Sequence, residues 1–232
     1  MEIPVFVHSY SCWYSIKYMS KELLEAMRDY EELSRKHFNK QAKIYDKTNT
    51  MLYSKYPKIS CKDVVDYLKD KSFTELLDVG CGTGYFIDML SKERNANYIG
   101  LDLSEEMIRV SQEKKIKQAT FTVGYADKLP FADHSFDVVT CIQSFHHYPD
   151  SKEAMNEAYR VLKTGGLYIL SDTGVGGFSK WLFNHITYKL ISSGDCETDD
   201  RSGISEKMEH CGFKVIRCEQ IQGKIYTVVG IK

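Results

Sequence analysis

The chain has 232 residues, of which 43% are hydrophobic, and a formal net charge of −1, which suits one α/β domain with an appended segment. The near-neutral charge argues against a nucleic-acid partner, since phosphate neutralisation requires clustered Lys and Arg, and no apolar run is long enough to span a membrane. Seven cysteines without a C-x-x-C pair predict neither a disulfide framework nor a zinc site, and they favour a reducing, cytoplasmic location.

The first 72 residues are interpreted as an extension followed by a helical cap. Residues 1–18 have no helical or strand period, so a poorly ordered extension is expected, with an aromatic flap over the active site as the alternative. From Ser20, apolar residues recur at helical spacing, and residues 19–72 are expected to form the cap. Ser60–Asp63 matches a capping box and predicts that a helix begins there.

A further helical piece is expected at Phe38–Asp46. Phe38, Ala42 and Tyr45 follow one another at i, i+4 and i+7 and would share one face of a helix. That face either docks the cap onto the core or contacts a ligand.

Leu76–Gly84 is the most informative segment, because a short apolar run ends in an acid and three alternating glycines. This pattern predicts a buried strand that turns sharply into a helix, with a backbone that a ligand can approach closely. The third glycine comes one residue too early for the dinucleotide fingerprint G-x-G-x-x-G, with Tyr85 in its place. A second apolar strand ends at Asp102, where an acid can hold the two hydroxyls of a ribose.

After the glycine loop, strand and helix patterns alternate, which predicts βαβ units and a parallel sheet. Two strands joined by a glycine turn follow near the end of the chain. The expected strands are 74–79, 97–102, 119–123, 136–142, 166–171, 212–216 and 223–229, and the expected helices of the core are 84–93, 104–114 and 150–162.

Five segments together resemble a known family. Asp78–Gly84 and Asp102 are followed, in order and spacing, by Gly124–Phe131, Phe136–Val139 and Arg160–Gly166. The set resembles the class I S-adenosylmethionine-dependent methyltransferases, in the small-molecule branch that includes the ubiquinone and menaquinone methyltransferases. The resemblance implies an α/β fold with a Rossmann-like seven-stranded, mostly parallel sheet, a C-terminal antiparallel hairpin and the N-terminal helical cap. The core is expected at 73–232, with a lid insertion at 174–203.

The same resemblance implies S-adenosylmethionine as cofactor and methyl transfer to an O, N or C atom of a small-molecule acceptor. Asp78 is expected near the methionine amino group, Asp102 at the ribose and Asp127 at the adenine amino group. The residues expected to bind the cofactor are Asp78, Gly80, Cys81, Gly82, Gly84, Asp102, Leu103, Met107, Ala126, Asp127 and Gln143.

His146 and His147 follow the fourth strand, at the edge where open α/β sheets bind ligands. They are candidates for a general base near neutral pH, with His147 preferred, or they hold the loop by hydrogen bonds to the backbone. Tyr45 completes the candidate catalytic set, because its segment resembles the piece that closes over the cofactor in this branch.

The stretch 174–203 combines glycines with large apolar side chains, which fits a lid over an apolar acceptor, a dimer contact or core packing. Its acidic run Asp195–Asp200 is expected to be a solvated loop, and no metal site is expected, because the carboxylates lack ligand spacing. Two other functions stay open: a non-catalytic protein that binds S-adenosylmethionine or S-adenosylhomocysteine, and a nicotinamide-dependent oxidoreductase, which the missing third glycine disfavours. The acceptor and the oligomeric state are left open.

Overall fold

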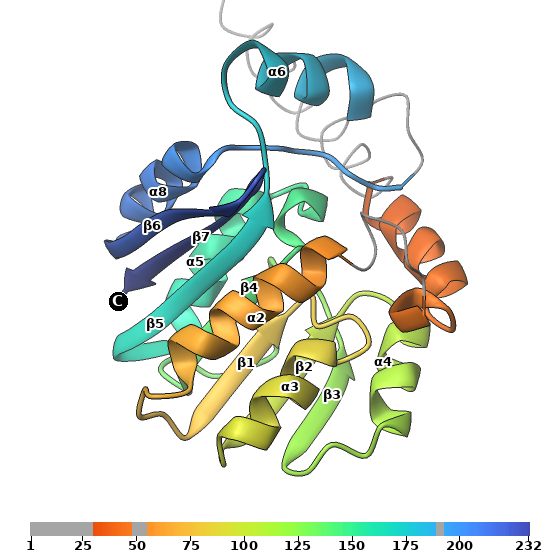
Figure 1. Ribbon diagram of the computed structural model, residues 1–232, viewed down its shortest axis with the longest axis vertical. Coiled ribbons are helices and arrows are strands. Elements are labelled where there is room, and N and C mark those ends of the chain that lie inside the picture. Colours follow the sequence, from red (N-terminus) through yellow and green to blue (C-terminus); the bar gives the residue numbers. More distant parts are fainter. Residues whose placement is uncertain (1–29, 48–54, 189–192) are drawn as a thin grey trace, which may run out of the picture.

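The computed structural model describes residues 30–47, 55–188 and 193–232, and a seven-stranded sheet forms its centre (Figure 1). The first five strands pair in parallel, and the last two form an antiparallel hairpin against the fifth, which confirms the expected fold class. The extension at 1–18 and the helix start at Ser20 lie outside the described residues. The strands are β1 (Glu75–Val79), β2 (Asn97–Asp102), β3 (Ala119–Val123), β4 (Phe136–Ile142), β5 (Leu162–Thr173), β6 (Lys214–Gln222) and β7 (Ile225–Ile231), in the spatial order β3-β2-β1-β4-β5-β7-β6.

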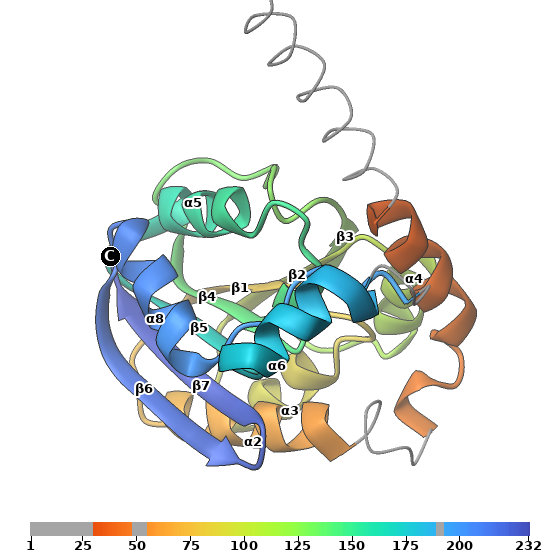
Figure 2. The ribbon, with the colours of Figure 1, turned by 90° about the horizontal axis from the view of Figure 1, so that it is seen from above.

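Helices cover both faces of the sheet (Figure 2). The helices α2 and α3 bury their apolar sides in one hydrophobic cluster, and α5 and α8 bury theirs in the other. Residues 30–41 form a further helix at the cap. The labelled helices are α2 (Tyr56–Leu68), α3 (Tyr85–Glu93), α4 (Glu105–Glu113), α5 (Ser151–Val161), α6 (Gly177–Leu182) and α8 (Arg201–His210), with 3-10 turns at Tyr45–Lys47 and Phe145–His147 and a π turn at Phe183–Thr187.

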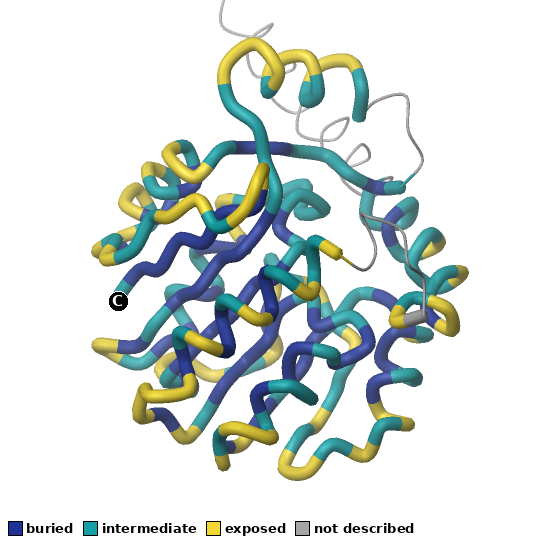
Figure 3. Tube along the Cα trace, in the orientation of Figure 1, coloured by how far each residue is buried: buried dark blue, intermediate teal, exposed yellow. Residues whose placement is uncertain are grey.

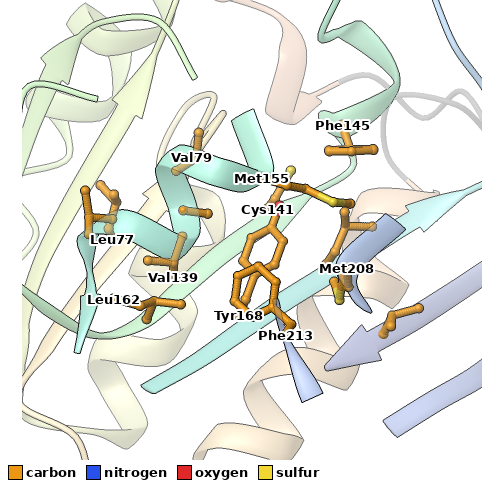
Figure 4. Packing of buried hydrophobic residues seen from close by; sticks show 14 of the residues in the cluster. Leu77, Val79, Val139, Cys141, Phe145, Met155, Leu162, Tyr168, Met208 and Phe213 are labelled. Carbon is orange, nitrogen blue, oxygen red and sulfur yellow. The ribbon is translucent and has the colours of Figure 1, made fainter. Parts of the chain in front are cut away.

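The central strands are buried on both faces, which explains why their sequences are largely apolar. In β1, successive side chains point to opposite sides, so Leu76 packs with the α2 and α3 cluster and Leu77 with the α5 and α8 cluster. Figure 3 shows the buried strands, and Figure 4 shows Leu77 and Val139 packed together with Met155 of α5 and Met208 of α8. This core fixes the carboxyl ends of β1, β2 and β4, where the candidate site lies.

The continuous helix expected over Phe38–Asp46 is wrong. The helix ends at residue 41, residues 42–44 form a turn, and Tyr45 begins a separate 3-10 turn. The carboxylate of Asp46 accepts hydrogen bonds from Thr83 Oγ1 and Lys114 Nζ, each at 2.7 Å. These tertiary contacts hold the end of the segment on the glycine loop, which a straight helix would not reach. The rings of Phe38 and Tyr45 nevertheless meet edge-on, with centroids 6.2 Å apart.

The capping box expected at Ser60–Asp63 is also wrong. The helix α2 begins one turn earlier, at Tyr56, with Pro57 in its first turn, where a missing N–H costs nothing. Ser60 is buried inside the helix, and its Oγ accepts a hydrogen bond from Gln143 Nε2 at 2.9 Å. The proline, and not the serine, was the start signal.

The acidic run Asp195–Asp200 is not a solvated loop. Asp199 is 5% exposed and forms ion pairs with Lys180 at 2.6 Å and Lys207 at 3.3 Å. Asp200 caps α8, because its side chain accepts hydrogen bonds from the backbone amides of Ser202 and Gly203. Among the described residues, no helix combines the length and apolar character that crossing a membrane requires.

Candidate active site

A cavity opens at the carboxyl ends of β1, β2 and β4, where parallel sheets place their ligands. Its empty volume, which includes the part open to solvent, is about 1310 Å³. Of the expected site residues, Gly84 and His146 do not line it. Those that do are Tyr45, Asp78, Gly80, Cys81, Gly82, Asp102, Leu103, Met107, Ala126, Asp127, Gln143 and His147.

The glycine loop lies along one wall of the cavity. Gly80, Gly82 and Gly84 have φ values of 75°, 53° and 73°, the left-handed region in which a side chain is strained. The amides of Gly80 and Cys81 donate hydrogen bonds to the carbonyl of Leu101, at 2.8 and 3.0 Å, and so fix the loop to β2. A Cβ on Gly80 would lie 2.3 Å from Ser144 Oγ, whereas a Cβ on Gly82 would meet nothing within 4 Å.

Gly84 has a packing role. A Cβ there would lie 2.9 Å from the ring of Phe121 on β3 and 3.2 Å from the Cβ of Ser111 on α4. The residue precedes α3 directly and lets the loop pass close to these side chains. Its absence from the cavity wall follows from this position beneath the loop.

Asp102 connects the glycine loop to the second half of the site. Its Oδ2 accepts a hydrogen bond from the Gly82 amide at 2.8 Å, and its Oδ1 accepts one from the Ser104 amide at 2.9 Å. Burial raises the pKa of this carboxyl, and the backbone hydrogen bonds oppose the rise. Each carboxylate oxygen can accept a second hydrogen bond. Asp102 therefore shapes the loop and still offers acceptors to a ligand in the cavity.

Asp78 is the last but one residue of β1; it lines the cavity and is 2% exposed. Burial raises its pKa to about 7, although the hydroxyl of Thr140 donates a 2.7 Å hydrogen bond to Oδ1 and opposes the rise. A carboxyl with this pKa changes its charge near neutrality, and a cation in the cavity would favour its ionised form.

Leu103, Met107, Ala126 and Asp127 also line the cavity. Met107 is 1% exposed, belongs to the buried face of α4 and lines the cavity. Burial raises the pKa of Asp127. The cavity lining therefore combines the apolar side chains of Leu103, Met107 and Ala126 with the carboxyl of Asp127.

Gln143 occupies a strained position after β4, with φ of 53°. Its amide hydrogen bond to Ser60 fixes α2 over the site, and its backbone N–H donates to the carbonyl of Ser171 at 2.8 Å. The side chain therefore has a positioning role that the sequence reasoning missed.

The two histidines differ in their surroundings. Burial opposes protonation of His146, but Asp172 lies with Oδ1 2.8 Å from His146 Nδ1 and raises the pKa of His146 to about 9. For His147, burial and the neighbouring charge of His146 lower the pKa. His147 faces the cavity, with Nδ1 3.3 Å from Ser34 Oγ and its ring edge-on to Phe38, whose centroid is 5.0 Å away. His146 lies behind it.

The cap helix at 30–41 is tied to the core by polar contacts. Asn39 Oδ1 accepts a 2.6 Å hydrogen bond from Ser104 Oγ, and Asn39 Nδ2 donates to Glu105 at 3.0 Å. Sequence reasoning identified this segment by resemblance but missed Asn39 and Asp46 as the residues that hold it, because neither partner is near them in sequence.

Known proteins resemble this chain in sequence and in fold. The sequence pattern of the family described as "Methyltransferase domain" matches residues 77–170. The demethylmenaquinone methyltransferase of Listeria monocytogenes serotype 4a is 34% identical over 212 residues, which covers 81% of this chain and 90% of that relative. The crystal structure of the YcgJ protein of Bacillus subtilis matches this structure with a TM-score of 0.60 and 28% sequence identity. The match covers 68% of this chain and 70% of YcgJ. A SAM-dependent methyltransferase from Aquifex aeolicus has the same fold, with a TM-score of 0.64 at 19% identity, covering 83% of this chain and 97% of that one.

The fold and the sequence together define a class I methyltransferase, an enzyme that takes its methyl group from S-adenosylmethionine. The chain belongs to this family, and within it resembles the demethylmenaquinone methyltransferases.

Proposed function

We propose that this enzyme transfers a methyl group from S-adenosylmethionine to an O, N or C atom of a small apolar acceptor. The observation that carries the proposal is the cavity, which is lined by the glycine loop, Asp102, Asp127, His147 and Tyr45 together. A cofactor occupies the loop side, and the remaining space, beside His147, takes the acceptor. The name of the Listeria relative makes demethylmenaquinone the first acceptor to test.

The cofactor is proposed to lie across the carboxyl ends of β1 and β2. Asp78 faces its ammonium group, Asp102 accepts hydrogen bonds from the ribose hydroxyls, and Asp127 accepts one from the adenine amino group. The remaining contacts are proposed for the backbone of Gly80, Cys81 and Gly82, for Leu103 and Met107 on the adenine faces, and for Ala126 and Gln143; Gly84 acts on the loop through packing.

S-adenosylmethionine supplies a methyl group on a sulfonium sulfur, which is already an activated electrophile. The protein therefore contributes mainly by aligning the two reactants and excluding water. His147 and Tyr45 are proposed to contact the acceptor, with His147 accepting a hydrogen bond or a proton from it. His146, which does not line the cavity, is proposed to position His147 from behind, since their rings lie 4.3 Å apart.

The core is proposed at 73–232, the cap at 19–72 and a lid over the acceptor within 174–203. Two observations support the lid. Gly174 and Gly176 precede α6 and Gly177 begins it, and the side chains of Phe178 and Trp181 on this helix are 75% and 49% exposed and stack on each other. The later part of the segment reaches the histidines, because the amides of Cys196 and Glu197 donate to the carbonyl of His146.

Cofactor affinity is expected to rise between pH 6 and pH 7.5. Burial raises the pKa of Asp78 to about 7, so lowering the pH below 7 protonates the carboxyl and removes its attraction for the cofactor ammonium. Below that pKa the affinity should fall by up to about tenfold per pH unit. Calorimetry with S-adenosylhomocysteine measures the profile. In Asp78→Asn the profile should be flat, and a pH dependence equal to that of the wild type in this variant would contradict the assignment.

Binding and turnover assays test the proposed function. S-adenosylhomocysteine should bind the purified chain, and incubation with S-adenosylmethionine and a short-chain demethylmenaquinone should give a product heavier by one methylene, detected by mass spectrometry. If that acceptor is inert, a panel of phenols, amines and activated carbon acids replaces it. Binding without turnover across the panel would favour the non-catalytic alternative. Binding of NAD without S-adenosylhomocysteine binding would favour the oxidoreductase.

A further inference from the structure

Two imidazoles and one carboxylate converge beside the cavity. His146 Nε2 lies 3.5 Å from Asp195 Oδ1, and His147 Nε2 lies 3.9 Å from the same oxygen. The three ligand atoms all lie within 4.8 Å of one another. Ligand atoms about 2.1 Å from a tetrahedral ion are about 3.4 Å apart, so small side-chain movements would complete the geometry. We propose that His146, His147 and Asp195 form a binding site for a divalent transition-metal ion.

A second set of contacts orients each ligand toward the shared point. The other ring nitrogen of His146 lies 2.8 Å from Asp172 Oδ1, and the other ring nitrogen of His147 lies 3.3 Å from Ser34 Oγ. Both rings therefore present Nε2 to the site. Asp195 uses its other oxygen, Oδ2, to accept a hydrogen bond from Ser193. A histidine whose second nitrogen is held by a carboxylate is a recurrent arrangement in metal sites, because it fixes the ring and strengthens its basicity.

The fold holds these residues in place from three directions. The histidines lie in the 3-10 turn Phe145–His147 after β4, and Asp172 lies near the end of β5. The segment that contains Asp195 is anchored by backbone hydrogen bonds of 2.9 and 3.3 Å to the carbonyl of His146. The sequence predicted no metal site, because the carboxylates of the acidic run lack ligand spacing. In the structure one carboxylate of this run, that of Asp195, lies beside the two histidines, and the fold brings it there.

The ligand set also indicates the class of ion. Two imidazoles and one carboxylate suit zinc, iron(II), cobalt or manganese better than calcium, which prefers oxygen ligands alone. The side chains of His146, His147 and Asp195 are 19%, 11% and 20% exposed, so an ion can reach them. Three protein ligands leave at least one coordination position open.

The open position gives the site a role that rests on the proposed function. Because His147 lines the cavity, an ion bound to its Nε2 would be separated from the acceptor space by no more than the width of the imidazole ring. A hydroxyl of the acceptor beside a divalent ion loses its proton to water at lower pH. The oxygen that remains can then form a bond to the methyl carbon of S-adenosylmethionine, while the bond from that carbon to sulfur breaks and the sulfur keeps its electron pair as the thioether S-adenosylhomocysteine. With the ion bound, His147 is a ligand and no longer accepts the proton, so the preferred acceptors are hydroxylated compounds.

Cobalt titration of the full chain, freed of metal with a chelator, tests the site. The wild type should bind one Co²⁺, with visible absorption bands that report the ligand field. Asp195→Asn and His146→Gln should weaken binding more than tenfold, and Asp172→Asn, which would not touch the ion, should weaken it about 10- to 100-fold. The controls His210→Gln and Asp70→Asn change exposed residues of the same types and should bind Co²⁺ as the wild type does.

Melting temperature and S-adenosylhomocysteine affinity, measured on every variant, separate lost ligands from lost folding. X-ray absorption at the cobalt edge of the wild type identifies two imidazoles independently of any variant. Absence of stoichiometric Co²⁺ binding, a shell with fewer than two imidazoles, or equal affinity in folded Asp195→Asn overturns the proposal. If the wild type binds S-adenosylhomocysteine and transfers methyl groups but binds no Co²⁺, the metal site alone is wrong and the proposed function stands.

Discussion

Gly80→Ala is expected to lower the melting temperature by about 8–16 °C and to abolish detectable cofactor binding. The Cβ would lie 2.3 Å from Ser144 Oγ and 2.5 Å from Ser144 Cβ, at a φ of 75° that L side chains rarely adopt. Overpacking costs about 1–3 kcal/mol and the left-handed conformation about 1–2 kcal/mol, so a total near 4 kcal/mol is expected. In a chain of this length each kcal/mol corresponds to about 2–4 °C.

Gly82→Ala is the matched control. Its φ of 53° carries the same conformational cost, but its Cβ would meet no atom within 4 Å. The melting temperature should therefore fall by only about 2–8 °C. Because Gly82 lines the cavity, cofactor binding should still be lost. Thermal melts and calorimetry with S-adenosylhomocysteine measure both effects.

A double-mutant cycle with Ser144→Gly isolates the clash at Gly80. Removing the Ser144 side chain eliminates the two closest atoms, so Gly80→Ala should cost less stability in the Ser144→Gly background than in the wild type. Strictly additive effects would mean that the conformation, and not the collision with Ser144, makes alanine unfavourable at Gly80.

The parts of the fold that follow from local chemistry could be predicted from the sequence. The alternation of apolar runs with helical patterns specifies βαβ units, and the boundaries of β2, β3 and β4 are those expected. Leu76–Gly84 combines a buried strand with residues that need positive φ, so the sharp turn from strand to helix is encoded within nine residues. Asp102 follows from its place at the end of β2, since parallel strands end at the same edge of the sheet.

The parts that depend on distant contacts could not be predicted. Asp46 holds the end of the cap segment by accepting hydrogen bonds from Thr83 and Lys114, which lie 37 and 68 residues away in sequence. No residue pattern within the segment predicts these contacts. Asp195 was assigned to solvent because six residues with four carboxylates resemble a polar loop. Its position beside His146 and His147 arises from backbone hydrogen bonds that no local pattern encodes.

The N-terminal cap shows a competition between two local signals. Ser60–Asp63 matched a capping box, but Pro57 had already set the start of α2 one turn earlier. Ser60 does not cap the helix; its buried hydroxyl instead accepts a hydrogen bond from Gln143, which is distant in sequence. The segment therefore matches the capping-box pattern although it lies inside the helix. In this region a proline therefore predicts the start of a helix better than a capping-box motif does, because proline restricts the backbone in any context.

Asp102→Ala is expected to weaken S-adenosylhomocysteine binding by at least about tenfold. Hydrogen bonds to a charged acceptor contribute about 1.5–3 kcal/mol each, and about 1.4 kcal/mol corresponds to a factor of ten. The substitution also removes the acceptor of the Gly82 and Ser104 amides, so part of the loss comes from a looser glycine loop. Asp102→Asn keeps the size of the side chain and one acceptor oxygen, and its loss should be smaller.

A ligand lacking one ribose hydroxyl separates the two contributions. A 2′-deoxy analogue of S-adenosylhomocysteine, which has lost one of the proposed hydrogen bonds, should bind the wild type several-fold more weakly than the parent ligand. In Asp102→Ala, which has no carboxylate for either ligand, the two affinities should converge, because the missing hydroxyl has no partner to lose. Thermal melts confirm that the variant is folded. If Asp102→Ala loses the same factor for both ligands, the carboxylate acts on the glycine loop through the Gly82 amide, and the ribose hydroxyls must find their partner elsewhere in the cavity wall.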